Sequence, residues 1–313
     1  IVGLPVAGFD RKRPLKNIAV VAKLLRSMNK ARRIARDFKP DIAVGVGGYA
    51  RGPMLRAAAA KGIPTLIQEQ NSYAGVTNRM LAKQASTICV AYEGMEQFFP
   101  KEKIVLTGNP CRQDLVISEE NRQAGYAFFG LDPAKKTSLM VGGSLGARTL
   151  NESITRAFPV LAGSDDVQVI WQCGKYYYNE MMQLHTDGKI PANVKLLDFV
   201  SRMDLAYSVA DLVISRAGAG SISEFSLLQK AVILVPSPNV AEDHQTKNAK
   251  ALVDKDAAVM VSDKLAPDVL FDVALALVRN DEQRKQLSDN IGKLAQHDSA
   301  ERIVNEIEKI IGR

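Results

Sequence analysis

The sequence predicts an α/β fold built from two doubly wound parallel sheets, one in each half of the chain. Short apolar runs that are typical of buried strands alternate with helical patterns along the whole length. Several of these runs end in a glycine turn that leads into a helix, as Asp41–Val46 does at Gly47 and Thr137–Val141 does at Gly142. Open α/β sheets bind ligands at such carboxyl ends of strands. The length of 313 residues is also typical of about two domains.

The first half begins with a long predicted helix over residues 14–38, whose apolar residues recur every three to four positions. An alanine-rich helix follows, with Pro53 in its first turn, and a further helix begins near Val76. The predicted strands are Asp41–Val46, Thr65–Ile67, Thr87–Val90 and Ile104–Leu106. Because Thr107–Arg112 contains a glycine and a proline, we place a domain boundary at about residue 112.

The second half repeats the alternation of strands and helices. An amphipathic helix over Ala300–Ile311 closes the chain, with Ile303, Ile307 and Ile310 on one side. The predicted strands are Thr137–Val141, Val167–Trp171, Val194–Leu197, Leu212–Ile214 and Val232–Val235. This pattern predicts a second parallel sheet.

The composition, with 46% hydrophobic and 24% charged residues, is that of a globular protein. The three cysteines lie far apart and show no metal-ligand or disulfide spacing, so we expect a reducing cytosol, no metal and no cofactor. We find no apolar run of about 18 residues that predicts a membrane span, and no signal peptide. Because the sequence opens with Ile1 instead of methionine, we expect that a piece is missing from the front.

The positive charge of the chain is concentrated in one segment. Residues 11–39 hold eleven Lys and Arg against one acid, Asp37, which gives +10 in a chain whose net charge is +7. The remainder therefore carries −3. A local basic patch indicates an anionic partner that is met at one place.

The predicted helix over 14–38 carries more than one stripe of residues. Its core stripe is Val20, Leu24, Met28, Ala31, Ala35 and Phe38, and its basic stripe is Lys16, Lys23, Arg26, Lys30 and Arg33. Between the stripes run three apolar residues, Ile18, Val21 and Leu25. Such a helix can lie on anionic lipid headgroups, or it can be an ordinary solvated basic face. Nucleic acid is disfavoured because no aromatic residues interleave with the charges.

The stretch Ser215–Glu224 follows the predicted strand Ala210–Ile214 and precedes a predicted helix over Phe225–Lys230. Ser221 and Glu224 have the spacing of a capping box, which would make them structural. Alternatively, the turn holds a diphosphate at the helix start and Glu224 accepts hydrogen bonds from a ribose. The local spacing leaves both interpretations open.

Other polar turns also have two interpretations. Gly142–Gly146 matches the nucleophile elbow G-x-S-x-G of hydrolases, but it also suits a phosphate, with Ser144 and Arg148 beside it. Asp243 precedes a predicted helix and is expected to cap it. We interpret the pair Asp254 and Asp256 as exposed surface, without a metal.

Six motifs occur in one order along nearly the whole chain, and this ordered set resembles the MurG family of bacterial glycosyltransferases. They are Gly45–Tyr49, Glu69–Asn71 with Ala74–Asn78, Gly108-Asn109-Pro110-x-Arg112, Gly142–Arg148, Arg216–Glu224 and Asp243–Asn248. The resemblance implies a GT-B fold, with two Rossmann-like domains and a cleft between them. The acceptor and membrane-facing domain would be residues 1–112 with a returning helix over 298–313, and the donor domain would be residues 113–297.

The resemblance implies an inverting hexosyltransferase that moves GlcNAc from UDP-GlcNAc to the MurNAc 4-hydroxyl of lipid I, without a metal, at the cytoplasmic face of the inner membrane. It assigns donor contacts to Asn71, Arg112, Ser144, Val200, Ala219, Gly220, Ser221, Ile222, Ser223, Glu224 and Gln245. It assigns acceptor contacts to Gly47, Gly48 and Tyr49. The membrane-facing residues would be Ile18, Val21, Leu25, Arg26, Lys30 and Arg33.

The sequence departs from the family pattern in one place. The first strand of the family and its G-G-T-G-G-H turn, which carries the proposed general base, do not occur in these 313 residues. The catalytic base therefore has no candidate. Two alternatives follow: a UDP-GlcNAc 2-epimerase, which shares fold and donor, or a UDP-sugar-binding module without turnover.

Overall fold

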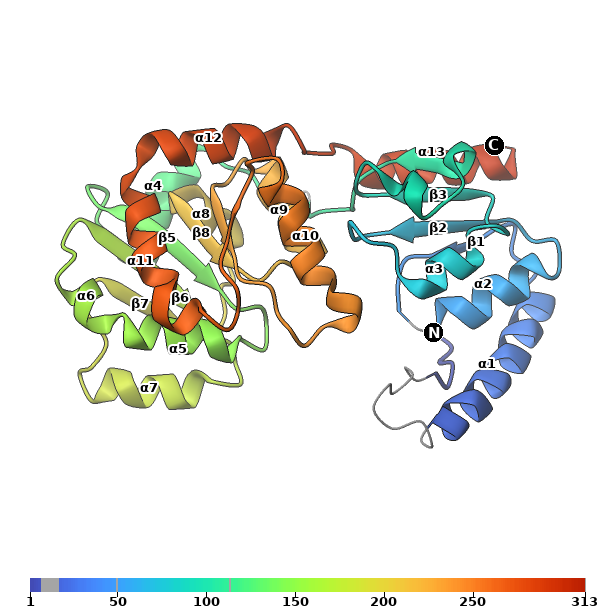
Figure 1. The fold of residues 1–313 in the computed structure, drawn as a ribbon, viewed down its shortest axis with the longest axis horizontal. Coiled ribbons are helices and arrows are strands. Elements are labelled where there is room, and N and C mark those ends of the chain that lie inside the picture. The colour runs from blue at the N-terminus through green and yellow to red at the C-terminus, as the bar shows by residue number, and fades with distance from the viewer. Residues whose placement is uncertain (7–16, 49, 113, 313) are drawn as a thin grey trace. The chain divides into compact units, whose positions relative to one another are not determined.

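The computed structural model describes residues 1–6, 17–48, 50–112 and 114–312, and it divides the chain into two compact units (Figure 1). Unit 1 comprises Ile1–Pro110 and Gln296–Arg313. Unit 2 comprises Cys111–Ala295. Each unit contains one parallel sheet with helices around it, as the alternating sequence pattern predicts.

Unit 1 has a four-stranded parallel sheet in the order β1-β2-β3-β4. Its strands are β1 (Ala43–Gly45), β2 (Thr65–Glu69), β3 (Thr87–Val90) and β4 (Ile104–Leu106). Its helices are α1 (Asn17–Phe38), α2 (Arg51–Ala59), α3 (Val76–Leu81) and α13 (Ser299–Ile311), with short 3-10 turns at Met95–Gln97 and Lys101–Lys103. All five residues of β2 are buried, which fits a central strand covered on both faces.

The last helix, α13, packs on the sheet of unit 1. Ile303 forms a buried cluster with Leu66 of β2 and Cys89 of β3, and Ile307 and Ile310 pack against it. Arg302 also donates a hydrogen bond to the carbonyl of Leu106 at the end of β4. The apolar stripe expected on this helix is therefore the face that anchors it.

The buried face of α1 differs from the predicted core stripe. Leu24 and Phe38 are 38% and 77% exposed, whereas Ser27, Ala31 and Ala35 are buried. The helix packs against α2, and Ser27 Oγ donates a hydrogen bond of 2.6 Å to the carbonyl of Pro5. Small side chains allow two helices to approach closely, so the larger apolar residues of α1 stay at the surface. The prediction ranked residues by hydrophobicity and was wrong for Leu24 and Phe38.

Unit 2 has a six-stranded parallel sheet in the order β10-β9-β8-β5-β6-β7. Its strands are β5 (Lys136–Val141), β6 (Val167–Gln172), β7 (Val194–Leu197), β8 (Leu212–Ser215), β9 (Val232–Leu234) and β10 (Val259–Met260). Its helices are α4 (Glu119–Phe129), α5 (Arg148–Arg156), α6 (Phe158–Ala162), α7 (Tyr178–Thr186), α8 (Met203–Val209), α9 (Ala219–Leu227), α10 (His244–Val253), α11 (Ala266–Arg279) and α12 (Asp281–Gly292).

The strand order of unit 2 reverses between β5 and β8. The chain proceeds from β5 to β6 and β7 on one side, and then from β8 to β9 and β10 on the other. At such a switch point the two loops that leave the strands diverge, and open α/β sheets bind ligands there. A ligand site is therefore expected at the loops that follow β5 and β8.

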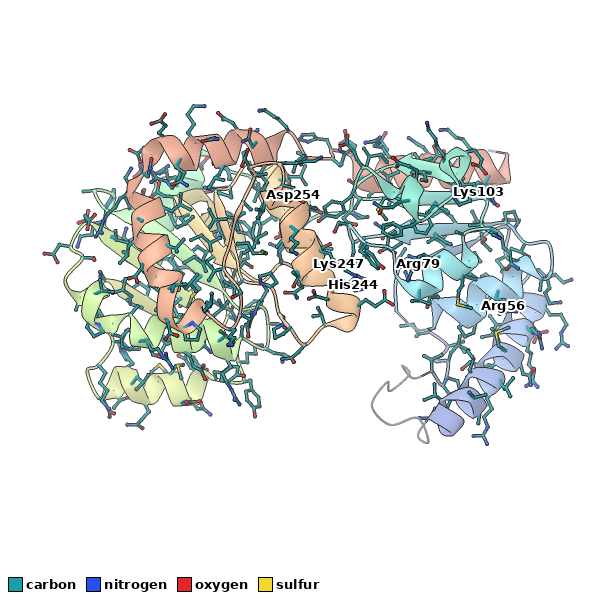
Figure 2. All side chains as sticks on the ribbon, viewed as in Figure 1. Arg56, Arg79, Lys103, His244, Lys247 and Asp254 are labelled. Atoms are coloured by element: carbon teal, nitrogen blue, oxygen red, sulfur yellow. The ribbon has the colours of Figure 1, made fainter. Side chains whose placement is uncertain are left out.

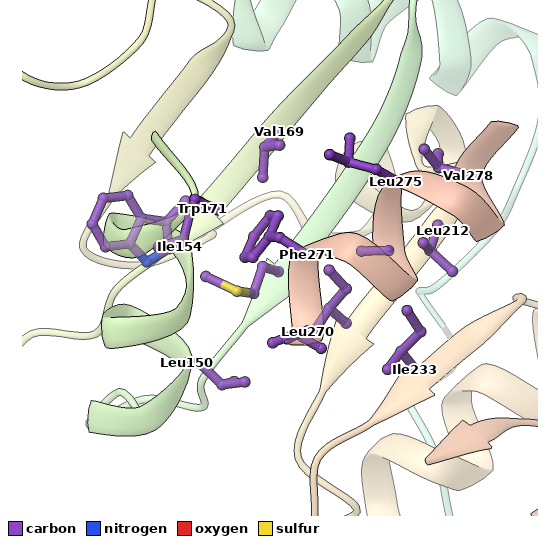
Figure 3. Close-up of a cluster of buried hydrophobic side chains, with 14 of the residues drawn as sticks. Leu150, Ile154, Val169, Trp171, Leu212, Ile233, Leu270, Phe271, Leu275 and Val278 are labelled. Atoms are coloured by element: carbon purple, nitrogen blue, oxygen red, sulfur yellow. The ribbon is translucent and has the colours of Figure 1, made fainter. Parts of the chain in front are cut away.

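One large core cluster of unit 2 packs between its sheet and the helices α5 and α11. Figure 3 shows Phe271 and Leu275 of α11 against strand residues that include Val169 and Leu212. Trp171 of β6 is fully buried, and its indole N–H donates a hydrogen bond of 2.9 Å to Asn151 Oδ1. Each fully buried large apolar side chain contributes about 1.5–3 kcal/mol to stability. This core holds the strand ends, and with them the site, in fixed positions.

Candidate functional site

The loops that follow β5 and β8 each lead into a helix of nine residues, α5 and α9. Neither helix has a side-chain cap at its first N–H groups or an acidic residue in its first turn. Because β5 and β8 are hydrogen-bonded neighbours, two uncapped helix starts lie on one edge of the sheet. Their N–H groups and dipoles favour an anion.

The loop after β5 is held by Gln172, which is 4% exposed at the end of β6. Its Oε1 accepts the N–H of Gly142 at 3.0 Å, and its Nε2 donates to the carbonyls of Gly143 at 2.8 Å and Asp198 at 3.1 Å. One side chain thus joins the loops after β5, β6 and β7. Ser144, expected to contact the donor, is exposed in the middle of this loop.

Two glycines let the loops after β5 and β6 meet backbone to backbone. Gly146 and Gly174 have φ angles of +85° and +88°. A Cβ on Gly146 would lie 2.1 Å from the carbonyl oxygen of Cys173, and a Cβ on Gly174 would lie 2.2 Å from the Cα of Gly146. Only glycine fits either position. The glycine pattern seen in the sequence therefore fixes the shape of this edge.

The helix α9 begins six residues earlier than predicted, at Ala219 instead of Phe225. Gly218 is its N-cap in an extended conformation, so Ser221 lies inside the first turn and the capping-box interpretation is wrong. Glu224 instead accepts a hydrogen bond of 3.0 Å from Tyr207 Oη of α8. The residues expected to contact the donor, Ala219, Gly220, Ser221, Ile222, Ser223 and Glu224, form the first turns of α9.

Glu224 is half-buried and lies among charged groups of the same unit. Burial raises the pKa of its carboxyl, while the hydrogen bond from Tyr207 and the charge of Arg112 oppose this rise and Asp114 adds to it. Arg112 is largely exposed and forms an ion pair of 3.6 Å with Asp114. Burial and the charge of Glu224 also raise the pKa of Cys111 to about 11. The structure therefore places Arg112 close enough to Glu224 for its charge to affect that carboxyl.

A second wall of the same edge is α10, with His244 and Lys247 in its first turns and Asp254 at its end (Figure 2). Asp243 stands at the N-cap, but in a left-handed conformation, and its carboxylate accepts from Thr246 Oγ1 at 2.6 Å instead of capping the backbone. Asp243 is therefore at the predicted N-cap position, but the predicted hydrogen bond from its side chain to the backbone is not formed. Asp254 and Asp256 are exposed, as expected.

Gln245 lies in α10, and its Oε1 accepts the N–H of Ser237 at 2.8 Å. The buried Asn248 of the same helix donates to the carbonyl of Ala217 at 3.3 Å. Ala217 directly precedes the N-cap of α9, so this bond ties α10 to the loop after β8. Among the described residues, no hydrogen bond from Gln245 Nε2 is found, so this nitrogen can donate to a ligand at α10.

Val200 follows β7, and the whole residue, backbone included, is 4% exposed. The neighbouring Phe199 is 49% exposed, and Lys175 Nζ lies 5.4 Å from the centre of its ring. This cation–π contact joins the loops after β6 and β7.

A half-buried ion pair stabilises the base of this edge. Arg216, directly after β8, pairs with Asp263, and their side chains are 16% and 21% exposed. Arg216 also donates to the carbonyl of Val235 at 3.0 Å, and Asp263 accepts from Thr149 Oγ1 of α5 at 3.1 Å. Asp263 therefore connects the start of α5 with the loop that leads to α9. Sequence analysis did not identify Asp263, because a single acid in the loop between β10 and α11 belongs to no repeating pattern.

Replacing Asp263 with asparagine is expected to lower the free energy of unfolding by about 1–2 kcal/mol, because it leaves the half-buried Arg216 without its ion pair. Urea denaturation measures this change. The matched control is Asp268→Asn, which breaks the ion pair of Arg156 and Asp268, whose side chains are 60% and 66% exposed. The control should cost less than about 1 kcal/mol. Equal losses in both variants would contradict the role given to Asp263.

In unit 1, the ends of β1 and β2 carry the remaining predicted residues. Gly47 and Gly48 have φ angles of +133° and +71°, while Tyr49 lies outside the described residues. Asn71 follows β2, and both its backbone N–H, at 3.1 Å, and its side chain, at 3.3 Å, donate to Glu69 Oε1. The bond from Gln70 Nε2 to the carbonyl of Val46, at 3.0 Å, joins the two loops.

The buried Glu69, which is 2% exposed, is a site residue for which the sequence had assigned no role. Its second oxygen accepts from the N–H of Gly75 at 3.1 Å and from Asn78 Nδ2 at 2.7 Å. Four neutral donors thus stabilise one buried carboxylate and shape the loop after β2. A polar residue at the end of an apolar strand was the available signal.

The basic and apolar residues expected to face a membrane lie at the surface of α1. Val21 and Leu25 are 45% and 62% exposed. Arg26, Lys30 and Arg33 are exposed, and Lys30 donates to the carbonyl of Gly3 at 2.9 Å. The side chain of Ile18 lies outside the described residues. No helix in the described ranges is both long enough and apolar enough to span a bilayer.

Two family models match this chain. The glycosyltransferase family 28 C-terminal domain matches residues 137–303, and the glycosyltransferase family 28 N-terminal domain matches residues 1–90. A Parabacteroides distasonis protein named UDP-N-acetylglucosamine–N-acetylmuramyl-(pentapeptide) pyrophosphoryl-undecaprenol N-acetylglucosamine transferase is 61% identical over 313 residues, which are 100% of this chain and 84% of the relative.

A Bacteroides thetaiotaomicron protein of the same name is 57% identical over 311 residues, which cover 99% of this chain and 83% of the relative. Among solved structures, that of Acinetobacter baumannii MurG is similar with a TM-score of 0.77 and 32% identity, over 93% of this chain and 79% of that chain. A UDP-GlcNAc 2-epimerase from Neisseria meningitidis bound to UDP-GlcNAc has a TM-score of 0.68 at 14% identity, which is a likeness of fold.

Proposed function

We infer the function from one premise: this chain belongs to the MurG family, within glycosyltransferase family 28, and it has the GT-B fold of two parallel-sheet α/β units. It is a hexosyltransferase that transfers GlcNAc from UDP-GlcNAc to lipid I and so forms lipid II for peptidoglycan. The observation that carries the site is the pair of uncapped helix starts, α5 and α9, beside Glu224 at the switch point of unit 2.

We propose that the diphosphate of the donor binds at the N-termini of α5 and α9, next to Ser144 and the first turn of α9. Glu224 accepts hydrogen bonds from the ribose hydroxyls, and the backbone of Val200 meets the uracil. Gln245 and Arg112 complete the donor contacts from α10 and from the start of unit 2. Asn71, after β2 of unit 1, is assigned to the donor by the family pattern alone.

In the reaction, the 4-hydroxyl oxygen of the MurNAc residue forms a bond with the anomeric carbon of GlcNAc. The bond from that carbon to the diphosphate breaks, and its electron pair leaves with UDP. We propose that the displacement inverts the anomeric centre. Negative charge grows on the departing diphosphate, where the fixed N–H dipoles of two helix starts stabilise it. The hydroxyl proton must pass to a base, which these residues do not identify.

On the acceptor side, we propose that the loop of Gly47 and Gly48 faces the diphosphate of lipid I. The positive φ angles of these glycines let backbone N–H groups approach a phosphate without a Cβ. We further propose that the exposed apolar and basic surface of α1 places the enzyme on the anionic cytoplasmic face of the membrane. Lipid-linked substrate lies in that surface, so docking raises its local concentration.

The transfer reaction has a direct test. We expect free UDP to be released from UDP-GlcNAc only when lipid I is present, together with an equal amount of GlcNAc-bearing lipid product. An epimerase would convert UDP-GlcNAc without the lipid, and a binding module would release no UDP in either case. Release that does not depend on lipid I would contradict the proposal.

A further inference from the structure

Tyr207 of α8 is the buried side chain that contacts the candidate ribose-binding carboxylate. It is 2% exposed, and its Oη donates a hydrogen bond of 3.0 Å to Glu224 Oε2. Its ring packs edge-on against Phe225 of α9, with ring centres 6.0 Å apart and an interplanar angle of 83°. The ring therefore fixes the hydroxyl, and the hydroxyl fixes one oxygen of the carboxylate.

This arrangement divides the two oxygens of Glu224 between protein and ligand. Within the described residues, Tyr207 is the side chain that hydrogen-bonds this carboxylate, and it uses Oε2. No described residue hydrogen-bonds Oε1, so this oxygen keeps its acceptor capacity for a ligand. A glutamate that is held in this way loses less side-chain freedom when a ligand binds than one that turns freely.

The same bond affects the ionisation of Glu224. Burial raises the pKa of the carboxyl, whereas the Tyr207 hydrogen bond and the charge of Arg112 favour the ionised form. Asp114 and Cys111 are the other titratable groups that interact with it, and Asp114 raises its pKa. An ionised carboxylate accepts hydrogen bonds from the hydroxyls of a diol more strongly than a protonated one. Removing the Tyr207 hydroxyl therefore raises the pH at which Glu224 gains a proton.

We propose that Tyr207 is a positioning residue for the nucleotide: its hydroxyl holds Glu224 so that the free carboxylate oxygen meets the ribose diol. This inference depends on the proposed function, because it takes the ligand of Glu224 to be the ribose of a uridine nucleotide. Tyr207 does not touch the ligand in this arrangement. Its effect passes through Glu224 and is specific to the ribose hydroxyls.

The test is Tyr207→Phe, which removes one oxygen and keeps the packed ring. We expect the affinity for UDP, measured by calorimetry, to fall about tenfold, because one hydrogen bond to a charged group is lost. The affinity for 2′-deoxy-UDP, which lacks one hydroxyl of the diol, should fall only about twofold. As the pH is lowered, UDP binding by the variant should also weaken at a higher pH than in the wild type.

The matched control is Tyr126→Phe, which removes another buried hydroxyl of unit 2, the one that accepts from Arg122 Nε at 3.0 Å. It should leave both affinities and the pH dependence unchanged. Equal losses for UDP and 2′-deoxy-UDP in Tyr207→Phe, without a shift in the pH dependence, would mean that Tyr207 only supports the fold. The ratio of the two affinities does not depend on the folded fraction. It therefore distinguishes a positioning role from a structural role even if the variant is less stable. A wild-type protein that binds neither nucleotide would instead overturn the proposed function.

Discussion

Replacing Glu224 with alanine is expected to weaken the binding of UDP-GlcNAc about 30- to 100-fold. The carboxylate is half-buried in the second turn of α9, whose start has no side-chain cap, and one of its oxygens has no hydrogen-bond partner among the described residues. Hydrogen bonds to a charged group contribute about 1.5–3 kcal/mol, and each 1.4 kcal/mol corresponds to about tenfold in affinity. Calorimetry with UDP-GlcNAc and with UDP should give similar losses, because the contact is to the ribose that both share.

Two further variants distinguish the loss of the contact between Glu224 and the ribose from a general loss of stability. Glu180→Ala removes an exposed carboxylate in the first turn of α7 and should leave the affinity unchanged. Glu224→Gln keeps the shape and can still accept a hydrogen bond from Tyr207, but it has no charge, so we expect an intermediate loss of affinity. If Glu224→Ala binds UDP-GlcNAc and turns it over like the wild type, the ribose role assigned to Glu224 is wrong.

Much of the fold was predictable because buried parallel strands have sequences that are short runs of apolar residues. The predicted strand Val167–Trp171 is β6, Val167–Gln172, and Thr87–Val90 agrees with β3 to the residue. The turn after β5 was predictable too, because its glycines mark it, and Gly146 has no room for a Cβ; Gly174, against which it packs, was not identified from the sequence. The ordered motifs then indicated the family, which periodicity alone could not.

The start of α9 was misplaced because helix propensity penalises the glycines of Gly218–Gly220. In a first turn this penalty matters less, since those N–H groups have no partner within the helix in any case. The sequence therefore suggested a turn where the structure has the uncapped helix start that an anion needs. The error concerned the boundary of α9, while the residues assigned to the site remained the same.

The residues that position the site were not predictable, because each acts through a tertiary contact. Gln172, Asp263 and Tyr207 are single polar residues without a repeating pattern, and their partners lie 17 to 114 positions away in the sequence. Nothing in local spacing distinguishes them from solvated side chains. A sequence motif identifies groups that touch a ligand more readily than the groups that hold them.

Binding to anionic membranes is the second large effect that we expect, and it depends on the charge of α1. Changing Arg26, Lys30 and Arg33 together to glutamine should reduce partition onto vesicles rich in anionic lipid about 100-fold. Each basic residue near such a surface contributes about 1 kcal/mol. Sedimentation with liposomes measures the bound fraction, and raising the salt concentration should weaken wild-type binding as the charges are screened.

The control for this prediction has the same change in net charge at another place. Lys250, Lys264 and Lys293 are exposed in unit 2, and their joint replacement by glutamine should leave vesicle binding close to that of the wild type. Leu25 is more exposed than Val21, the other described apolar residue expected to face the membrane. Leu25→Ser should therefore also reduce binding to anionic vesicles, since the apolar surface enters the headgroup layer. If the triple variant of α1 sediments as the wild type does, the basic stripe is a solvated face, and lipid I must reach the enzyme by another route.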